Sequence, residues 1–520
     1  MAYFDKAKMS NGTVVDVQDT KGRALADTNL DVAKTELNNT IATKVNKEAA
    51  ARQEADTAIR SALTQESNTR AEEDVKLSDQ ITKALAAQYY ANVKDFGAKG
   101  DGVADDTTAI QSALNDGRPV VFPSGHYICS GAKFSSGAHL IGYGDAILEN
   151  KTSDCVLINK ADGVTGGYDA TKDVIIEGLT LSSPTTTYTT ILAIGHANNI
   201  VIKNCIFDGL KMWHMIEING SSNCTVDACL FRNYGDTTQN YSEIIQLDAM
   251  TDSVVFPWFG PYDNAQCRDI KIVNSSFFGN GTLNGIVPSA IGNHSLTLGP
   301  VGVIIEGCYF YNLGSATKFV VGQDIVINNN IVSYCHAGFY FNGSIVDVLV
   351  SNNLINGRSN WGSDSARGIA TYLNGSHPVT NIVVTGNHVY NMGQHGISLQ
   401  GGSLTIANNI VHNCGNSGIY TAYWCNDTNI ASNNLYNNGQ AGDTSDARNV
   451  DIYVNVVNNS NFLSTGIYLN NNKAKIINCV GGQQASGTVI VVNNNYTEEL
   501  RKSNAAKMIF NNNCIKGVFS

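Results

Sequence analysis

Hydrophobic and polar residues alternate in short stretches through most of the chain, and one phrase of this alternation keeps returning after residue 200. In each copy, apolar residues first alternate with polar ones. Then come Asn, Cys or Ser, a further apolar residue, and polar residues at the end of the copy. Most copies begin about 22 to 25 residues apart, a unit too short to bury its own apolar face. Neighbouring units must therefore stack, and the pattern predicts a parallel β-helix, an all-β solenoid. The copies are VIKNCIFDG, TVDACLFRN, KIVNSSFFGN, IIEGCYFYN, VINNNIVSY, LVSNNLING, VVTGNHVYN, TIANNIVHN and NIASNNLYN.

One polar position of each copy is expected to face the interior at a turn. An Asn at this position can hydrogen-bond to the Asn of the turns above and below, which satisfies buried polar groups. The chain contains Cys 12 times, and several of these residues occupy the same position, so we expect reduced, buried thiols and no disulfides. The equivalent residues are Cys205, Cys229, Ser276, Cys308, Asn330, Asn353, Asn387, Asn409 and Asn434.

A second short strand follows a Gly in many turns, as in GIATY, GISLQ, GIYTA, GFYFN and GIYLN. Successive side chains of a strand point to opposite faces, so the residues between the apolar ones point to solvent. Rows of amides, rings and carboxylates suit a sugar chain, although the outer face of any β-helix is polar. No Arg or Lys is expected in either of the two outward columns. The first column is Glu217, Gln246, Gly292, Tyr340, Ala370, Ser398 and Tyr420, and the second is Asn219, Asp248, His294, Asn342, Tyr372, Gln400 and Ala422.

Two carboxylates and an imidazole cluster on adjacent predicted turns. Glu217 and Asp248 lie on a diagonal, which places their β-carbons about 8 Å apart. Inverting glycosidases hold their two carboxyl groups about 6.5–9.5 Å apart, which leaves space for a water molecule. His294 is expected beside Asp248, as a proton carrier or a hydrogen-bond donor. The predicted catalytic residues are therefore Glu217, Asp248 and His294, together with Asp263 from the loop that follows Asp248.

The tryptophans and the loop of residues 250–263 are predicted to shape a cleft. This loop contains FPWFGPYD and follows Asp248 almost directly, so it can form an aromatic, proline-stiffened wall. Packing of each Trp, including Trp213, on the side of the solenoid is an equally good interpretation. The predicted substrate-binding residues are Asn219, Glu243, Gln246, Trp258, Tyr340, Asn342, Trp361, Tyr372, Gln400, Tyr420 and Trp424.

The N-terminal region has a different pattern. Residues 31–88 are rich in Ala, Glu, Lys, Gln and Thr and lack Pro and Gly, and the arrangement around Arg52 recurs around Arg70. Arg52 and Arg70 are 18 residues apart, which equals about five α-helical turns. A long, polar, exposed helix is not expected to be stable alone, so the region predicts an oligomeric coiled coil. A solvated single helix or a flexible linker stays open as the alternative, and residues 1–30 are expected to be an attachment segment.

Residues 92–114 read NVKDFGAKGDGVADDTTAIQSAL. Asp106 or Thr107 can N-cap a short helix here. The segment resembles the start of the pectate-lyase-like superfamily, in which this pattern opens a right-handed β-helix and the short helix plugs its first turn. With the repeats, it predicts a β-helix over residues 89–470 and a closing β segment over 471–520. The apolar side of the short helix is Ala109, Ile110, Ala113 and Leu114.

Composition excludes several classes of function. The formal net charge of −11 argues against nucleic acid as a partner, because phosphate binding requires a basic surface. No apolar run is long enough to span a membrane, and the N-terminus has no signal-peptide pattern. The sequence contains no CxxC, HExxH or GxxxxGK[ST] motif, so no metal ligand and no cofactor is expected.

A coiled coil, the motif of residues 92–114 and a β-helix, in this order, resemble bacteriophage tailspikes and depolymerases. The resemblance implies a parallel homotrimer, made in the host cytoplasm and attached through its N-terminus to the virion tail or baseplate. It also implies that the β-helix binds or cleaves a bacterial surface polysaccharide.

Glycoside hydrolysis by paired carboxylates is favoured over β-elimination. Elimination requires a base and a cation beside a uronic acid, and His294, Arg268 and Arg367 are the residues available for it. A non-catalytic receptor-binding spike is the alternative function, and a free-living polysaccharide enzyme is the third.

Overall fold

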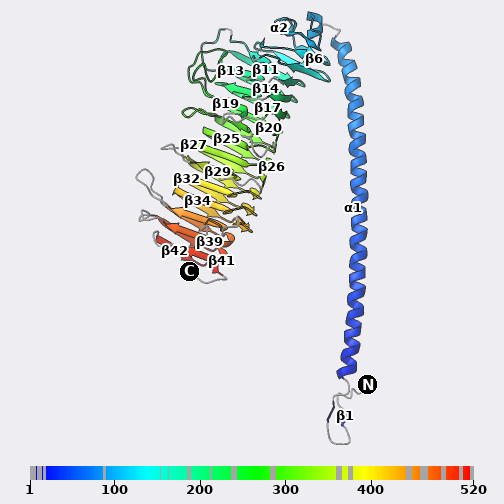
Figure 1. Ribbon diagram of the computed structural model, residues 1–520, viewed down its shortest axis with the longest axis vertical. Helices are drawn as coiled ribbons and strands as arrows, with labels where there is room; N and C mark the ends of the chain where they lie inside the picture. The colour runs from blue at the N-terminus through cyan, green and yellow to red at the C-terminus, as the bar shows by residue number, and fades with distance from the viewer. Residues whose placement is uncertain are drawn as a thin grey trace. The chain divides into compact units, whose positions relative to one another are not determined.

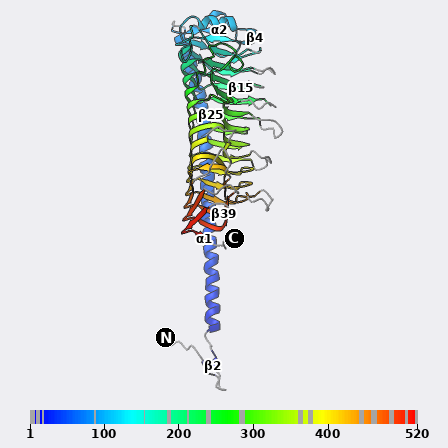
Figure 2. The ribbon, with the colours of Figure 1, turned by 90° about the vertical axis from the view of Figure 1, so that its left-hand side faces the viewer.

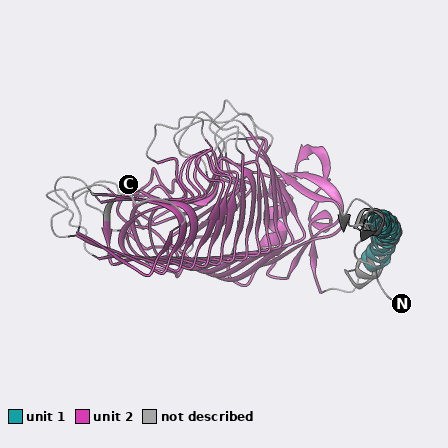
Figure 3. Cartoon of the chain, turned by 90° about the horizontal axis from the view of Figure 1, so that it is seen from below, with its two compact units in different colours: residues 1–83 teal, residues 84–520 magenta. Residues whose placement is uncertain are grey.

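The structure is a computed structural model, and it consists of two compact units, residues 1–83 and 84–520 (Figure 3). The described residues are 7–8, 14–15, 19–85, 89–152, 154–161, 163–183, 189–210, 213–235, 243–280, 288–358, 366–372, 379–440, 448–456, 466–481, 488–502 and 507–515.

The first unit contains β1 (Ala7–Lys8), which pairs antiparallel with β2 (Val14–Val15), and the helix α1 (Asp19–Leu85) (Figure 1). The helix begins at Asp19, inside the segment expected to serve for attachment, and not at residue 31. Pairs of charged residues one turn apart, such as Arg52 with Glu48, line its surface. Exposed pairs of this kind stabilise a helix little. No helix among the described residues is both long enough and apolar enough to cross a membrane.

Apolar side chains of α1 lie exposed along its length. Packing within the helical unit itself therefore leaves this apolar area uncovered. The exposed apolar residues of the helix are Leu25, Leu30, Val32, Leu37, Ile41, Val45, Ile59, Leu63, Val75 and Leu77.

The second unit is a parallel β-helix, and Figure 2 shows its strands as stacked layers. Strands β3 to β43 form one hydrogen-bonded array whose neighbours come from successive turns. The first sheet, which carries the candidate site, contains β7 (Ala132–Phe134), β10 (Leu157–Asn159), β13 (Leu192–Gly195), β16 (Ile216–Asn219), β19 (Glu243–Asp248), β22 (Ser289–Gly292), β29 (Ile369–Tyr372), β34 (Ile419–Asn426) and β37 (Ile452–Val456).

Two further sheets complete each turn. The second sheet contains β3 (Ala91–Asn92), β5 (Val120–Phe122), β8 (His139–Gly142), β11 (Thr171–Glu177), β14 (Ala197–Lys203), β17 (Ser222–Asp227), β20 (Arg268–Val273), β23 (Val301–Glu306), β30 (Val379–Thr385), β35 (Thr428–Ala431), β38 (Ile467–Asn470), β40 (Val489–Asn493) and β42 (Lys507–Asn511). The third contains β4 (Asp101–Asp105), β6 (Gly125–Ile128), β9 (Ala146–Glu149), β12 (Thr180–Ser182), β15 (Ile206–Leu210), β18 (Leu230–Tyr234), β21 (Ser276–Phe278), β24 (Tyr309–Tyr311), β26 (Ile331–Cys335), β28 (Leu354–Gly357), β31 (His388–Tyr390), β33 (Ile410–His412), β36 (Asn434–Tyr436) and β43 (Cys514–Ile515).

Longer strands cross the corners between sheets. Three of them, β25 (Ser315–Asn328), β27 (Ala337–Ser351) and β32 (Ile397–Ala407), run from the first sheet into the second. Two others, β39 (Lys473–Gly481) and β41 (Tyr496–Lys502), run from the third sheet into the first. Stacking of this kind continues through β43, so the described residues after 470 extend the same β-helix.

The interior is built from columns of like residues, one per turn. Phe207, Phe231, Phe277 and Phe310 stack with successive ring centroids 4.9, 4.6 and 5.0 Å apart. Such columns are expected when a short repeat places the same residue type at the same position of each turn. All twelve cysteines are free and all but Cys514 are buried, which confirms the expectation of unpaired thiols.

The predicted asparagine ladder is present. The backbone N–H of Asn387 donates to Oδ1 of Asn409 (2.9 Å), and that of Asn409 donates to Oδ1 of Asn433 (3.0 Å). Two predicted members were wrong by one residue, because the ladder contains Ser275 and Asn433 in place of Ser276 and Asn434. In both turns two like residues stand side by side, and the one that directly follows the left-handed residue, Asn274 or Ser432, faces inward.

The first turn is closed by a 3-10 helix, η1 (Val93–Phe96), and by α2 (Thr107–Leu114). The short helix buries Ile110, Ala113 and Leu114, as expected for a plug. The predicted cap was wrong in one detail, since the side chain of Asp106 makes no cap hydrogen bond. Its carboxylate accepts from the backbone N–H groups of Lys99 and Gly100 (2.6 and 3.0 Å), so it fixes the preceding turn.

Candidate active site

The outward columns of the first sheet follow the predicted register. Glu217 of β16 pairs with Gln246 of β19, and Asn219 pairs with Asp248. Gln246 in turn pairs with Gly292 of β22. Glu217 and Asp248 therefore lie on the expected diagonal between adjacent turns.

The expectation that no Lys or Arg stands in the columns was wrong. Lys318 of β25 pairs with Gly292 on one side and with Tyr340 on the other, so it belongs to the first column. This turn was not recognised from the sequence pattern, because the polar residue Thr317 fills the inward position that is apolar in most other turns.

A cleft of about 400 Å³ opens on this part of the sheet. One wall comes from the loop of residues 250–263, where Trp258 packs against Phe256 with ring centroids 4.9 Å apart. Phe256 is buried with Ile158 and Ala193, so the first sheet anchors the loop. The prediction that this loop forms a wall is consistent with this placement. The cleft is lined by Trp213, His214, Glu217, Gln246, Val254, Val255, Pro257, Trp258 and His294.

Glu217 presents a nearly buried carboxyl group to the cleft. Thr190 donates its hydroxyl to Oε2 (2.9 Å), and Asn219 donates its side-chain amide to Oε1 (3.2 Å). Burial, with a smaller contribution from the nearby Asp248 carboxylate, raises the pKa of Glu217 to about 8, against the lowering effects of Thr190 and His294. Glu217 is therefore protonated at neutral pH, as a general acid must be.

His294 lies between two acidic residues. Its Nε2 is 3.2 Å from Oε2 of Glu243, and its Nδ1 is 3.4 Å from Oδ2 of Asp248. Burial opposes its charge, but these carboxylates raise the pKa of His294 to about 9. Burial raises the pKa of Asp248, whereas the pKa of Glu243 is lowered, because His294 outweighs the effect of burial there. At neutral pH the site therefore contains a cationic imidazole that neutralises buried acid groups.

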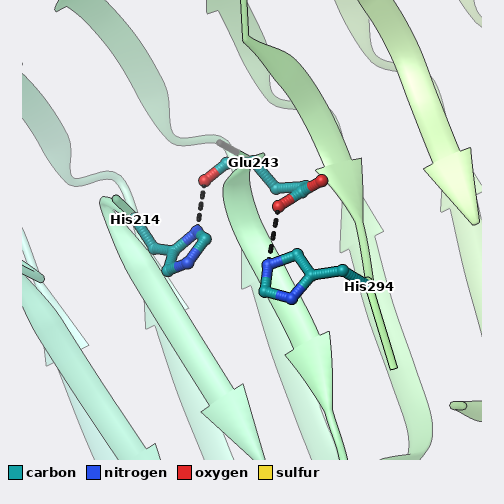
Figure 4. Close-up of side chains that lie close together, drawn as sticks. All are labelled: His214, Glu243 and His294. Carbon is teal, nitrogen blue, oxygen red and sulfur yellow. Dashed lines mark hydrogen bonds and ion pairs between the residues drawn. The ribbon is translucent and has the colours of Figure 1, made fainter. Parts of the chain in front are cut away.

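His214, which was not predicted as a site residue, completes the cluster. It lies two residues before the start of β16, and its Nδ1 lies 2.7 Å from the backbone carbonyl oxygen of Glu243. Burial lowers the pKa of His214 to about 4, so the ring is neutral and donates from Nδ1. Figure 4 shows His214 and His294 on either side of Glu243. These three residues each offer one ligand atom, and the atoms lie within 4.8 Å of one another.

Asp263 lies outside this group. Its carboxylate accepts from the backbone N–H of Gly167 (2.6 Å) and of Ala265 (2.9 Å), so it fixes the loop, and it does not line the cleft in the described part of the chain. Gln246 donates its side-chain amide to Oδ2 of Asp248 at 2.5 Å, which holds that carboxylate in place.

The remaining predicted binding residues lie further along the first sheet. Tyr340 stacks on Tyr372 at 4.8 Å, and the Arg367 guanidinium lies 4.6 Å from the Tyr372 ring centre. Tyr420 stacks on His395 at 4.2 Å. Two more positions, Asn342 and Gln400, belong to the same face. Trp361 and the side chain of Trp424 lie outside the described residues.

Comparisons with known proteins agree with this architecture. A family model described as rhamnogalacturonase A/epimerase, pectate lyase-like, matches residues 90–340. A second model, described as a right-handed beta helix region, matches residues 292–460.

Two curated relatives and one solved structure illustrate the similarity. Plasmin and fibronectin-binding protein A of Streptococcus pneumoniae (strain ATCC BAA-255 / R6) is 28% identical over 311 residues, which are 52% of this chain and 43% of the relative. The pre-neck appendage protein of Bacillus phage phi29 is 38% identical over 85 residues, 16% of this chain and 10% of the relative. The solved structure of the Streptococcus pneumoniae surface protein and adhesin PfbA has a TM-score of 0.49 at 19% identity, and covers 83% of this chain and 100% of that chain.

The chain spans less than half the length of these two curated relatives. The two family models overlap and together cover most of the second unit, including the motif that opens it and every strand of the cleft. Over residues 90–340 the chain is therefore similar to pectate lyase-like proteins, and over residues 292–460 it is similar to right-handed β-helix proteins.

Proposed function

We propose that the chain is a phage tailspike that binds a bacterial surface polysaccharide in this cleft and hydrolyses its glycosidic bonds. The observation that carries the proposal is the carboxyl group of Glu217, which faces the cleft with its pKa raised to about 8. Two tryptophans, Trp213 and Trp258, line the same cleft and offer faces on which sugar rings can stack.

In this proposal Glu217 gives its proton to the glycosidic oxygen as the bond to the anomeric carbon breaks. A water molecule adds to that carbon, and its proton passes to Asp248, the second carboxylate of the pair. Asp248 is 1% exposed and lies behind His294. The base role therefore requires the imidazole of His294, which is 25% exposed, to turn aside when the glycan binds.

Variants of the two carboxylates test the proposal. Glu217→Gln keeps the size and hydrogen-bonding capacity of the side chain but removes its acidic proton, so cleavage should fall by about 10²–10⁴-fold. Asp248→Asn should reduce it to a similar extent. Host glycan is incubated with each variant, and new reducing ends and glycan affinity are both measured. Tyr436→Ala, an exposed ring of the third sheet, is the matched control and should cleave normally.

The same assay separates hydrolysis from β-elimination. Lys318 adds a cation to the first column, and with His294 it could neutralise a uronic acid. Reducing ends without the ultraviolet absorbance of an unsaturated uronic acid support hydrolysis. Reducing ends accompanied by that absorbance mean elimination and contradict the proposed reaction.

The second candidate function is a receptor-binding spike that holds the glycan without cleaving it. It is favoured by the position of Asp248, which does not line the cleft among the described residues. The name of one relative, a plasmin and fibronectin-binding protein, is also consistent with binding alone. Glycan binding by the parent chain with no new reducing ends would establish this function.

Attachment to a virion and trimer formation belong to the same proposal. The match to the pre-neck appendage protein of a Bacillus phage supports the first. The uncovered apolar residues of α1 support the second, because a parallel bundle of three helices would bury them. Localisation by electron microscopy of phage labelled with an antibody to the chain tests the attachment.

A further inference from the structure

We propose that His214, Glu243 and His294 form a binding site for a divalent transition-metal ion, with zinc as the representative ion, at the floor of the cleft. The three side chains come from three successive turns, before β16, at the start of β19 and after β22. One potential ligand atom from each lies within 4.8 Å of the others. The site goes beyond the proposed glycan-cleaving function and does not depend on it.

The distances suit a metal after small movements of the side chains. Zinc bonds of about 2.0–2.2 Å hold neighbouring ligand atoms about 3.4 Å apart in a tetrahedral site. Nε2 of His294 is already 3.2 Å from Oε2 of Glu243. The rings of His214 and His294 have their centroids 5.8 Å apart, so both imidazoles are near enough to share one ion after such movements.

Each imidazole is also oriented as in known metal sites. A histidine that binds metal through one ring nitrogen usually donates from the other to a carboxylate or a backbone carbonyl. Nδ1 of His214 lies 2.7 Å from the carbonyl oxygen of Glu243, which leaves its Nε2 as the ligand. Nδ1 of His294 faces Asp248 at 3.4 Å, which leaves its Nε2 on the side of Glu243.

The set of ligands selects the class of ion. Two imidazoles and one carboxylate favour zinc and its neighbours in the first transition row, whereas calcium and magnesium require mostly oxygen ligands. Three protein ligands leave one position of a tetrahedral ion open. His214 and His294 both line the cleft, so an ion bound here is reachable from solvent and can be removed by a chelator.

Isothermal titration of the metal-stripped, tag-free full chain with Zn²⁺, in the absence of glycan, tests the proposal. We expect the titration to show one ion per chain. Thermal unfolding with zinc should show a higher melting temperature than without it, because the ion binds only the folded state. Glu243→Gln and His294→Gln should each lower the affinity more than about 100-fold, and Asp248→Asn should lower it about 10–100-fold. His294 is partly exposed, so its variant should fold if replacement of Glu243 proves disruptive.

A second pair of histidines provides the matched control. Nε2 of His388 is 2.8 Å from Nε2 of His412 on the third sheet, so this pair could also attract zinc. His388→Ala should leave the affinity of the site unchanged. The proposal is overturned if the parent chain takes up no zinc, if the cleft variants bind as tightly as the parent, or if His388→Ala removes the binding.

The two proposals fail separately. Zinc binding is measured without glycan, so an inactive protein that binds one zinc retains the metal site and loses only the proposed hydrolysis. Conversely, glycan cleavage by a chain that takes up no zinc contradicts only the metal site.

Discussion

Burial of the Glu217 side chain has a direct effect on its chemistry, because it raises the pKa of the carboxyl group. Its carboxyl group is almost inaccessible, and its hydrogen bonds come from neutral donors, the hydroxyl of Thr190 and the amide of Asn219. Neutral donors stabilise an anion less than a cation would. The acid form therefore persists to about pH 8 in the folded chain.

Glu217→Gln should stabilise the fold in a pH-dependent way. The folded chain keeps this proton up to about pH 8, whereas an unfolded chain releases it near pH 4.3. Between these values the folded state binds more protons, so the free energy of unfolding falls as pH rises. The Gln side chain does not ionise, so the variant is spared this fall in the free energy of unfolding. The stability of the variant relative to the parent should therefore increase with pH up to about pH 8, by at most about 1.4 kcal/mol per pKa unit.

Urea unfolding of the parent and the variant at several pH values measures this effect. At about pH 3, below both pKa values, Glu217 is neutral in the folded and in the unfolded state, so any difference from the Gln variant found there reflects packing alone. An advantage that stays constant from about pH 3 to about pH 8 would show that Glu217 ionises normally.

The alternation of the strands was sufficient to predict that Glu217, Asp248 and His294 meet. It was insufficient for His214 and Lys318. His214 precedes its strand, where no alternation fixes the direction of a side chain. Lys318 follows an inward Thr, so its turn lacks the apolar signal by which the other turns were recognised.

At the scale of the elements, the asparagine ladder links each turn to the next. Asn409 accepts at Oδ1 both the backbone N–H and the side-chain amide of Asn387. It also donates its own side-chain amide to the carbonyl of Val384 and to Oδ1 of Asn433. Each ladder residue therefore satisfies buried groups in the turns on both sides.

Asn409→Ala should lower the free energy of unfolding by about 2–4 kcal/mol, because two donors of Asn387 lose their acceptor while buried. Asn434→Ala, one residue past the ladder and only half-buried, is the matched control and should cost less than about 0.5 kcal/mol. Chemical denaturation measures both. Equal losses from the two substitutions would mean that the ladder contributes nothing specific.

The loop of residues 250–263 forms one wall of the cleft. Trp258→Ala removes one aromatic face and should weaken glycan binding about fivefold, since a stacked ring contributes about 1 kcal/mol. Glycan affinity is measured by titration. The control Tyr436→Ala removes a ring that lies outside the cleft and should bind as the parent does. Unchanged binding by the Trp258 variant would place the glycan elsewhere on the sheet.

The repeats predicted the stacking of the strands better than they predicted which residue faces inward at the turns between strands. Asn and apolar residues recur at fixed positions, so the stacking of turns followed from the sequence. The inward residue at a turn depends on which residue takes a left-handed backbone conformation. Where Ser275 and Ser276, or Asn433 and Asn434, are chemically alike, the sequence contains no information that selects between them.

At the scale of the whole molecule, α1 carries the prediction about assembly. Sedimentation equilibrium should give the full chain three times the mass of one 55.6 kDa chain. Replacing Leu37 and Ile41 by Lys places charge among the uncovered apolar residues and should shift the mass toward that of one chain. The control replaces Asn39 and Thr43, which have the same spacing, by Lys and should remain trimeric. A monomeric parent chain would contradict the proposed coiled coil.

The dependence of each turn on its immediate neighbours alone has a consequence for the length of the rod. The chemistry of the cleft is drawn from turns that contain β16, β19 and β22. Whole turns could therefore be added or removed towards the C-terminal end while the geometry of the cleft is kept. The length of the solenoid and the chemistry of the cleft are thus two properties that this architecture can adjust independently.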